Sequence, residues 1–354
     1  MCKAWAAAWA LLVRRRHYLN PAPLRVLELP VAEGEGDLVF SFAVMPDKAL
    51  CVRSAALTMH FFSPAGESLE DDSHWDALRV AADGHPTGVV RWRDDGLDWH
   101  AAGMLVHDEA LFISTGRSSK NGDGYVVKLR LGDGLELARS QLMDQPTSMA
   151  IAGDCLVVGA ADERVQLLDM RTLAPRGVSF RCRIDCIQDI AVCGDELVLA
   201  CDFCPIVTTL QGEPLRDLLH VRHPALETVT RGARQITAHG TSLYIIEKTK
   251  DSEEALLWSG YEDPEDPEEE EDEDYEETRK EVELELEQFP EQAGRRIAVL
   301  GLDGTLLQYV NLPDFSDGDW PHLAMRWHDG ELYVLNLRDS LETQTLRCVV
   351  MGTR

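Results

Sequence analysis

The sequence predicts an all-β fold built from repeated units, and three observations lead to this prediction. The string IAVCGDELVLACD at residues 190–202 nearly repeats MAIAGDCLVVGAA, which stands 41 residues earlier at 149–161. In both copies apolar and β-branched residues alternate on either side of a Gly-Asp pair, which is typical of two strands joined by a tight turn. Helical periodicity is nearly absent between residues 40 and 260, which disfavours a TIM barrel or a doubly wound fold.

The strand-turn-strand pattern occurs six times. The other copies are FAVMPDKALCV (42–52), MLVHDEALFI (104–113), ITAHGTSLYII (236–246) and AMRWHDGELYVL (324–335). A second pair of strands follows most copies, as in VQLLDMRTLAPRGV and IVTTLQGEPLRDLL. Units of four strands and about 40 residues, each burying its faces only against its neighbours, are typical of a β-propeller.

The spacing of the copies predicts the number of blades. A leucine marks the second strand of each unit, and successive gaps between these leucines are 61, 45, 41, 46 and 89 residues; they are Leu50, Leu111, Leu156, Leu197, Leu243 and Leu332. The first gap contains residues 66–98 and the last contains residues 250–294. We therefore expect six blades, or seven if residues 66–98 form a further, degenerate blade.

The ends of the chain predict how the ring closes. After ELYVLNL only one more strand, TQTLRCVVM, precedes the end of the sequence, so the last unit lacks a fourth strand. An unpaired edge at this point would invite aggregation. The strand LRVLEL at residues 24–29 comes just before the first unit, and we expect it to supply the missing strand.

These phrases resemble the propeller superfamily, in particular six-bladed repeats of the NHL or YVTN kind. RIAVLGLDGTLL is similar to their third strand, turn and fourth strand. The order of the WD-repeat signature is absent, because Trp75 and Asp76 precede Gly84 and His85 instead of following them. The resemblance implies the fold and carries no functional residues onto this sequence.

The sequence divides into an N-terminal extension, residues 1–22, and the propeller, residues 23–354, which contains the acidic insertion 250–294. The extension has Trp5, Trp9 and Leu12 at helical spacing, and the first 27 residues of the chain carry five Lys and Arg but no acid, which predicts a short helix or an organelle transit peptide. Its apolar run is too short to span a bilayer. Nine cysteines, an odd number, favour a reducing compartment, so we expect a cytoplasmic or nuclear protein, or an organellar one if residues 1–20 are a transit peptide.

The charge of the chain is strongly asymmetric. It carries 34 Lys and Arg against 62 Asp and Glu, a net charge of −28, which disfavours direct nucleic-acid binding. From Glu262 to Glu287, 17 acids stand against two bases, so this stretch alone contributes −15. Such a segment cannot bury enough apolar surface to fold, and we expect it to be disordered and either to bind a basic protein partner or only to solvate the chain. Its densest run is Glu268, Glu269, Glu270, Glu271 and Asp272.

The long connections are expected on one face of the propeller. Turns of an antiparallel meander alternate between its two ends, so loops between second and third strands share a face with the loops between blades. GRSSKNGDG (116–124), CDFC (201–204) and the acidic insertion all lie between second and third strands. Because binding residues concentrate on loops of rigid scaffolds, we expect a protein partner on this face.

The mouth of the central channel is a second candidate site. Aligning the first strands on their turns places Ser41, Ala102, Ser148, Asp189, Gln235 and Leu323 at one level, with a second set, which includes Arg234 and His322, just before it. Asp189, Arg234, Gln235 and His322 would bind a small ligand or metal there. The alternative interpretation, which we favour, is that they are solvated rim residues.

Four cysteines form a weaker candidate site. Cys182 and Cys186 flank one connection between blades, and Cys201 and Cys204 bracket the following loop, a spacing compatible with tetrahedral zinc. Cysteine is also readily buried as a small apolar residue, and packing is the favoured interpretation.

Motifs of catalysis are absent from the sequence. It has no Gly-X-Ser-X-Gly, His-Glu-X-X-His, Gly-X4-Gly-Lys or Gly-X-Gly-X-X-Gly pattern. We therefore expect a non-enzymatic propeller scaffold that binds a protein partner, with no cofactor and no membrane insertion. A more specific form of this hypothesis is that the partner is basic. The alternative is a metal-dependent hydrolase or lactonase that uses the channel mouth.

Overall fold

The computed structural model describes residues 19–20, 22–30, 39–54, 59–68, 103–115, 123–131, 135–144, 146–160, 163–177, 179–182, 187–201, 205–218, 233–247, 296–312, 323–336 and 345–353. In these ranges the chain forms strands and turns and contains no helix, so none of them holds a helix that could cross a membrane. The predicted N-terminal helix, most of residues 66–98 and the acidic insertion lie outside the described residues.

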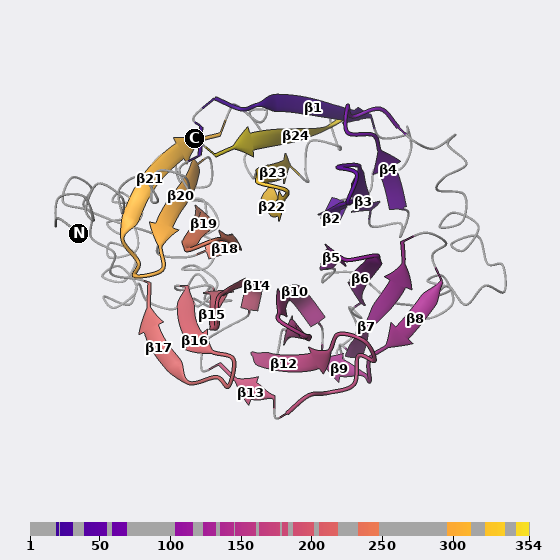
Figure 1. Cartoon of the computed structure of the whole chain (residues 1–354), viewed down its shortest axis with the longest axis vertical. Coiled ribbons are helices and arrows are strands. Elements are labelled where there is room, and N and C mark those ends of the chain that lie inside the picture. The colour runs from indigo at the N-terminus through magenta and orange to yellow at the C-terminus, as the bar shows by residue number, and fades with distance from the viewer. Residues whose placement is uncertain are drawn as a thin grey trace, which may run out of the picture.

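The strands form antiparallel sheets arranged as a ring (Figure 1). The first three sheets along the chain contain β2 (Val39–Val44), β3 (Leu50–Ser54) and β4 (Met59–Phe62); β5 (Met104–His107), β6 (Ala110–Thr115), β7 (Asp123–Arg130), β8 (Glu136–Arg139) and β9 (Met143–Asp144); and β10 (Pro146–Ala152), β11 (Cys155–Ala160), β12 (Arg164–Asp169) and β13 (Phe180–Arg181).

The remaining sheets contain β14 (Ile187–Cys193), β15 (Glu196–Cys201), β16 (Ile206–Thr209) and β17 (Pro214–Asp217); β18 (Ala233–His239), β19 (Ser242–Glu247), β20 (Arg296–Gly301) and β21 (Leu306–Asn311); and β22 (Leu323–His328), β23 (Glu331–Asn336) and β24 (Thr345–Gly352) with β1 (Arg25–Pro30). Five sheets have at least the four strands of a full blade, and the sheet of β2, β3 and β4 has three. The innermost strands contact one another in cyclic order, and β2 contacts both β5 and β22. The all-β propeller predicted from the sequence is therefore confirmed.

Each repeated phrase forms the first hairpin of its sheet, as predicted. The alternation places one side of each strand against one neighbouring blade and the other side against the next, so both sides are buried. The six marker leucines lie in the second strands, and all of them are 0% exposed. Buried apolar residues gather in clusters between adjacent blades, such as Phe42 and Val52 with Tyr333 and Leu335.

The hairpin turns show why the phrases contain glycine and aspartate. Gly153 and Gly194, the first turn residues of β10–β11 and β14–β15, have φ values of 59° and 63°. At Asp329 and Gly330, both turn residues have positive φ, 46° and 74°. Two-residue hairpin turns need this left-handed backbone because it matches the twist of the strands.

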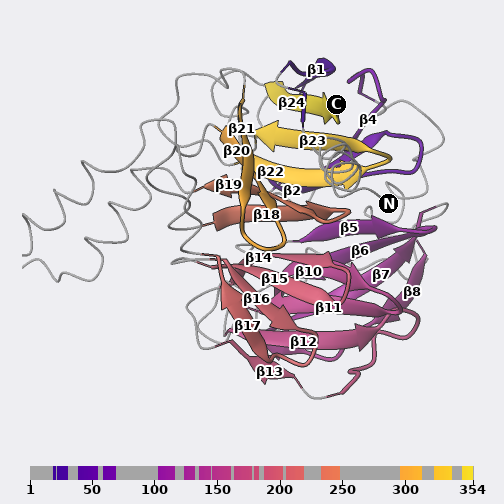
Figure 2. The ribbon, with the colours of Figure 1, turned by 60° about the vertical axis from the view of Figure 1, so that its left-hand side comes forward.

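The strands run between two faces of the ring, which differ in their connections (Figure 2). The turn face carries the hairpin turns between first and second strands and between third and fourth strands, for example at residues 153–154 and 170–171. The loop face carries the connections between second and third strands. Residues 248–295 join β19 to its partner β20, so the chain leaves and re-enters this blade at the loop face.

Strand β1 completes the sheet of β22, β23 and β24. It pairs antiparallel with β24 from Arg25 opposite Val350 to Pro30 opposite Thr345. Leu27 and Leu29 are buried in the cluster between this sheet and the sheet of β2, β3 and β4. The strand predicted at residues 24–29 therefore exists and pairs with the last strand of the chain.

One predicted fourth strand differs from the structure. The phrase 165–178 suggests a fourth strand ending near residue 178, whereas β13 is Phe180–Arg181. The carboxylate of Asp169 instead holds a turn here, because its Oδ1 atom accepts hydrogen bonds from the backbone N of Thr172 at 2.9 Å and the Thr172 hydroxyl at 2.9 Å. Before β13 the described residues form an isolated bridge between Leu168 and Pro175, with backbone hydrogen bonds from Arg176 to Leu167 and from Asp169 to Ala174.

Candidate functional site

Asp189, the carboxylate proposed for the channel mouth, is buried between two blades and is 4% exposed. Its Oδ1 atom accepts a hydrogen bond from the backbone N–H of Ile190 at 2.9 Å. Its Oδ2 atom accepts one from the backbone N–H of Ile236 at 3.1 Å. Because Ile190 lies on β14 and Ile236 on β18, this carboxylate joins the innermost strands of neighbouring blades. It does not stand on a solvated rim.

The environment of Asp189 has opposing electrostatic effects. Burial raises the pKa of the carboxyl group, while the positive charge of Arg326 and the two backbone hydrogen bonds lower it, and the net shift is upward. A buried carboxylate with both oxygens bonded to backbone N–H groups is satisfied as an acceptor. Its geometry is that of a structural link between blades.

The first strands carry a repeated irregularity beside this level. The pairing register shifts just before Ser41, Ser148, Asp189 and Gln235, which indicates a β-bulge in each strand. The register also corrects the predicted alignment in two blades. Ala324, opposite Leu335, stands at this level in place of Leu323, and Gly103, whose carbonyl accepts a hydrogen bond from the backbone N of Ser114, stands there in place of Ala102.

The bulge at residue 147 gives its side chain a bridging role. The Thr147 hydroxyl lies 3.0 Å from the carbonyl oxygen of Ile187 in the next blade and 3.2 Å from that of Gly159 in its own. It thus connects β10 to β14, much as Asp189 connects β14 to β18. The level proposed as a binding site therefore serves, at these two positions, to hold adjacent blades together.

The other predicted mouth residues are described only in part. Gln235 is half-buried on β18, and Arg234 belongs to the same strand, but its side chain lies outside the described residues. His322 and the acidic run 268–272 also lie outside them. The structure therefore brings Asp189 and Gln235 to neighbouring blades and leaves the proposed set of four untested.

The cysteine candidate is likewise incomplete. Cys182 is buried, and desolvation, with a smaller effect of Glu163, raises the pKa of its thiol to about 12. Cys186, Cys204 and the side chain of Cys201 lie outside the described residues. Among the described side chains, no group of three or more His, Cys, Asp or Glu residues is placed to hold a metal. Zinc binding stays a prediction.

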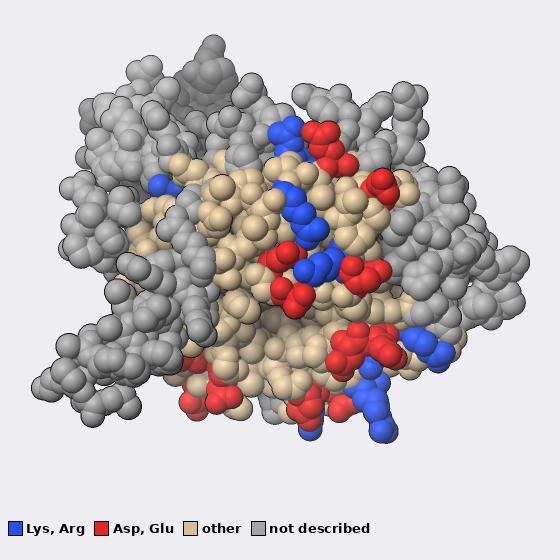
Figure 3. Space-filling model, turned by 45° about the horizontal axis from the view of Figure 1, so that its top comes forward, with Lys and Arg blue, Asp and Glu red and all other residues tan. Residues whose placement is uncertain are grey.

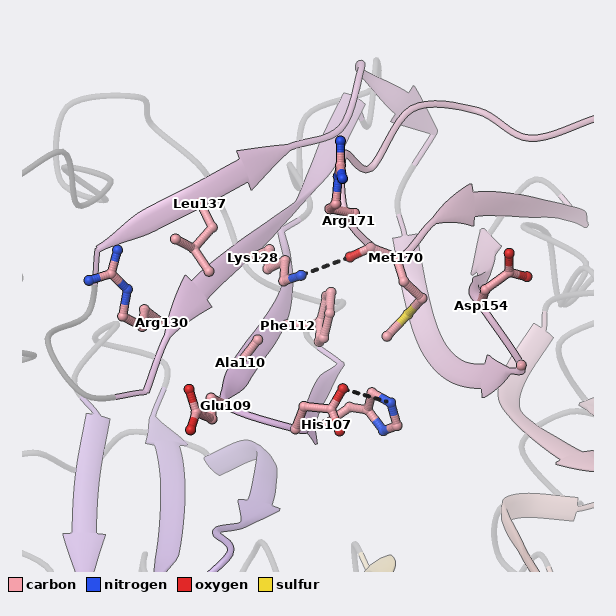
Figure 4. A pocket seen from close by; sticks show the side chains of 12 residues that line it. His107, Glu109, Ala110, Phe112, Lys128, Arg130, Leu137, Asp154, Met170 and Arg171 are labelled. Atoms are coloured by element: carbon pink, nitrogen blue, oxygen red, sulfur yellow. Dashed lines mark hydrogen bonds and ion pairs between the residues drawn. The ribbon is translucent and has the colours of Figure 1, made fainter.

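A pocket that the sequence did not predict lies on the turn face, between the sheet of β5–β9 and the sheet of β10–β13 (Figure 4). Its volume is about 740 Å³, within the size range of ligand pockets. The turns between β5 and β6 and between β10 and β11 form its inner wall. Strands β7 and β8 and the turn after β12 form its outer wall.

The floor of the pocket is apolar and held in place by a lysine. Phe112 is fully buried, and the Nζ atom of Lys128 lies 5.5 Å from the centre of its ring. The same Nζ donates a hydrogen bond of 2.9 Å to the carbonyl oxygen of Met170 in the next blade. Lys128 therefore links the two blades that form the outer wall. Phe112, Ala110 and Met170 lie together beneath the opening (Figure 4).

The charges around the opening are sorted by wall. The inner wall carries acids, Asp108 and Glu109 from one turn and Asp154 from the other. The outer wall carries bases, namely Arg130, Lys128 and Arg171. In Figure 4 Arg171 lies on the side of the pocket away from Glu109, whereas Arg130, which is opposite Ala110 in the pairing of β6 with β7, lies nearer to it.

Two contacts fix the acidic wall and the basic turn. Asp154 forms an ion pair with Arg176, and this hydrogen bond is the main cause that lowers the pKa of the Asp154 carboxyl. The Asp169 carboxylate also accepts a hydrogen bond from the backbone N of Arg171 at 3.1 Å, which orders the turn that carries this arginine. Asp154 therefore stays ionised at neutral pH, and the backbone of Arg171 is held beside the pocket.

The surface beyond the pocket has mixed charge. In Figure 3 acidic and basic side chains of the described residues stand next to one another and do not separate into two large regions. Sequence reasoning treated these turn residues only as turn formers. One feature of the sequence could have indicated this pocket. In these two units the acids lie in the turns between first and second strands, and the bases lie in or near the third and fourth strands.

No family model matches the chain, and a comparison with curated proteins gives no match. Three solved structures are among those to which the chain is similar. A chain in a crystal structure of the mitotic checkpoint complex is 11% identical, with a TM-score of 0.48, covering 90% of this chain and 76% of that one. BamB from Moraxella catarrhalis is 10% identical, with a TM-score of 0.41 and coverages of 89% and 86%. A protein of unknown function from Bacteroides caccae is 9% identical, with a TM-score of 0.47 and coverages of 79% and 83%.

Proposed function

We propose that this chain is a non-enzymatic propeller scaffold that binds a basic protein partner at its loop face through the acidic insertion. The observation that carries the proposal is the distribution of charge. Residues 262–287 hold −15 of the net charge of −28, and the remainder of the chain holds about −13. A charge run of this density attracts a Lys- and Arg-rich partner over roughly 8 Å at physiological ionic strength.

The position of the insertion in the chain supports this proposal. Strands β19 and β20 pair from Ser242 opposite Gly301 to Ile246 opposite Ile297. Both are central strands of a blade and need no other segment to complete their pairing. Residues 248–295 are therefore an addition to the blade, and a change within them is expected to leave the ring folded.

The alternative, a metal-dependent hydrolase or lactonase at the channel mouth, has less support. A catalytic calcium or zinc ion needs several free carboxylate, amide or imidazole ligands. Asp189, the carboxylate suggested for that role, uses both oxygens to accept backbone hydrogen bonds. The scaffold hypothesis requires no such ligand.

We also propose that the ring has six blades and that β1 latches it. The cyclic contacts of the six innermost strands support this count, as does the pairing of β1 with β24. A closed ring presents two rigid faces, which suits a scaffold whose loops bind a partner.

The test compares partners captured from a cell extract by the full chain and by a variant in which residues 262–287 are replaced by a Gly/Ser linker of equal length. We expect basic proteins to bind the full chain, to be lost from the variant, and to dissociate steeply between about 50 and 200 mM salt, because exposed charges are screened. Equal capture by the variant, or binding that does not change with salt, would refute the proposal.

A matched control uses a second replacement in which the acids of residues 262–287 are scrambled in order but kept in number. Binding driven by charge density should survive this change. A melting temperature equal to that of the full chain in both variants establishes that the ring is intact.

A further inference from the structure

We propose that the pocket on the turn face is a second binding site, which takes a short extended segment of a protein partner containing one apolar side chain between a basic and an acidic residue. The site lies on the turn face, opposite the ends of β19 and β20 that residues 248–295 join, and between two other blades. It is therefore independent of the function proposed above.

The composition of the pocket favours a protein segment over a small metabolite. Pockets for small molecules are lined mainly by apolar and aromatic side chains. Here seven of the twelve lining residues are titratable, and four are apolar, namely Ala110, Phe112, Leu137 and Met170. Figure 4 shows Ala110, Phe112 and Met170 in the middle of the pocket. An apolar centre within a polar rim, with aromatic, Met and Arg side chains present, is the usual anatomy of a protein interface.

The centre of the pocket fits one apolar anchor. Leu137 is 43% exposed although it is a large apolar residue, and it lines the same pocket as the buried ring of Phe112 and the side chain of Met170. A Leu-sized side chain inserted here would remove the exposed part of Leu137 from water. Lys128 is already bonded to the carbonyl oxygen of Met170, so this insertion leaves its ammonium group satisfied.

The two walls determine the charges that flank the anchor. A basic residue of the segment would face Glu109 on the inner wall, and an acidic residue would face Arg171 on the outer wall. A segment with two residues of the same charge would place one of them against a wall of like charge. Charge complementarity therefore predicts a mixed-charge segment and one preferred direction across the pocket.

The test uses an array of end-capped heptapeptides in which a central Leu is flanked by Lys and Asp in either order, by two Lys, by two Asp, or by two Ser. Affinities are measured by fluorescence anisotropy with the full chain. We expect one order of the mixed-charge peptide to bind best, and the same peptide with Ala in place of Leu to bind at least about tenfold more weakly. Equal binding of all peptides, or of none, would overturn the proposal.

Charge-exchange variants separate a binding role from a structural one. Arg171→Glu should weaken the best peptide by about two- to fivefold, the range of exposed ion pairs, and should shift the preference to the peptide with two Lys. Glu109→Lys should shift it to the peptide with two Asp. A loss of binding without these shifts in preference would contradict the assignment of the walls.

An exposed arginine and an exposed glutamate outside the pocket provide matched controls. Arg181 is exposed on β13, in the same blade as Arg171, and Glu213 is exposed beside β17; neither lines the pocket. Arg181→Glu and Glu213→Lys should leave peptide affinity unchanged, and an effect equal to that of the pocket variants would overturn the proposal. The chain with the Gly/Ser linker at residues 262–287 should bind the peptides as the full chain does, so the two proposals fail separately.

Discussion

At the scale of single residues, Asp189 shows how a buried charge can serve the architecture. Its two oxygens accept hydrogen bonds from the backbones of two blades, although burial raises the pKa of the carboxyl group. Without the carboxylate, two buried N–H groups would lack an acceptor. The structure therefore tolerates the desolvation of one acid to satisfy two backbone donors.

Replacing this side chain should be costly. We expect Asp189→Ala to lower the free energy of unfolding by about 2–4 kcal/mol, because each buried, unsatisfied N–H group costs about 1–3 kcal/mol. Urea denaturation at pH 7 measures this difference. Ser148→Ala is the matched control, since Ser148 stands at the same level, is 4% exposed, and its hydroxyl has no hydrogen-bond partner among the described residues. A cost for Ser148→Ala equal to that for Asp189→Ala would show that the hydrogen bonds are not the cause.

The sequence could not distinguish these roles at single residues. The alignment on the hairpin turns placed Asp189 and Ser148 at the same level, which is correct, and suggested a solvated mouth there. Whether a side chain at this level points into the channel or between blades depends on the bulge that precedes it. A bulge is a property of pairing between strands, and the alternation of apolar residues does not reveal it.

At the scale of elements, a polar network ties β1 to the strands beside it. The Nη2 atom of Arg25 lies 2.8 Å from Oε2 of Glu331 on β23 and 3.1 Å from the hydroxyl of Tyr333. The Tyr333 hydroxyl donates to the same Glu331 oxygen at 2.9 Å, and Nζ of Lys48, in the β2–β3 turn, lies 3.3 Å from it. Three side chains from three segments, Arg25, Tyr333 and Lys48, therefore meet at the carboxylate of Glu331.

This network predicts a pH dependence of stability. Burial alone would raise the pKa of Glu331, but the hydrogen bonds from Tyr333 and Lys48 and the charge of Arg25 hold it below its usual value of 4.5. A lowered pKa in the folded state gives stability that is fully present above the unfolded-state value and is lost as the pH falls through the folded-state value. We expect Glu331→Gln to lower the free energy of unfolding by about 1 kcal/mol at pH 7. This difference should disappear below the folded-state pKa.

Glu28 provides the comparison for this experiment. Its Oε1 atom lies 4.0 Å from Nη2 of Arg347, and its side chain is 71% exposed. Glu28→Gln should change the free energy of unfolding by less than about 0.5 kcal/mol at pH 7. A difference for Glu331→Gln that stays constant from pH 7 to pH 3 would contradict the role given to the network.

The first hairpins were predictable because both of their strands are buried on both sides and joined by turns with distinctive residues. The fourth strands were less so. A fourth strand pairs on one side only and alternates half-buried with exposed residues, as β8 does, so its apolar pattern is weak. The displacement of β13 to Phe180–Arg181 follows from this weakness and from the turn at Asp169.

At the scale of the whole molecule, the ring should depend on β1. We expect a chain that lacks residues 1–30 to melt at a lower temperature and to self-associate, because the edge of β24 and the cluster around Leu27 and Leu29 become exposed. Each of these leucines contributes about 1.5–3 kcal/mol on burial. Thermal melting and light scattering measure both effects.

The control is a chain that lacks only residues 1–18, which keeps Leu19, Asn20 and all of β1. A synthetic peptide of residues 19–30, added to the shorter chain, should restore the melting temperature. If removal of residues 1–30 leaves a monomer with an unchanged melting temperature, β1 does not close the ring.

The two candidate sites also differ in how far the sequence alone predicts them. The acidic insertion was evident from composition alone, because charge density needs no structure. The pocket was not, since its acidic and basic walls come from turns of two blades, and Glu109 and Arg171 are 62 residues apart in the sequence. Only the contact between neighbouring blades brings these turns together.

The pairing of β1 with β24 also has a consequence for folding of the chain during its synthesis on the ribosome. Arg25 and its partner Val350 are more than 300 residues apart, so Val350 is synthesised long after Arg25. The early blades can therefore form while the edge of β1 waits for its partner, and folding is completed only after β24 has left the ribosome. A nascent chain of this kind carries an open strand edge throughout its synthesis, the period in which chaperones usually protect such edges.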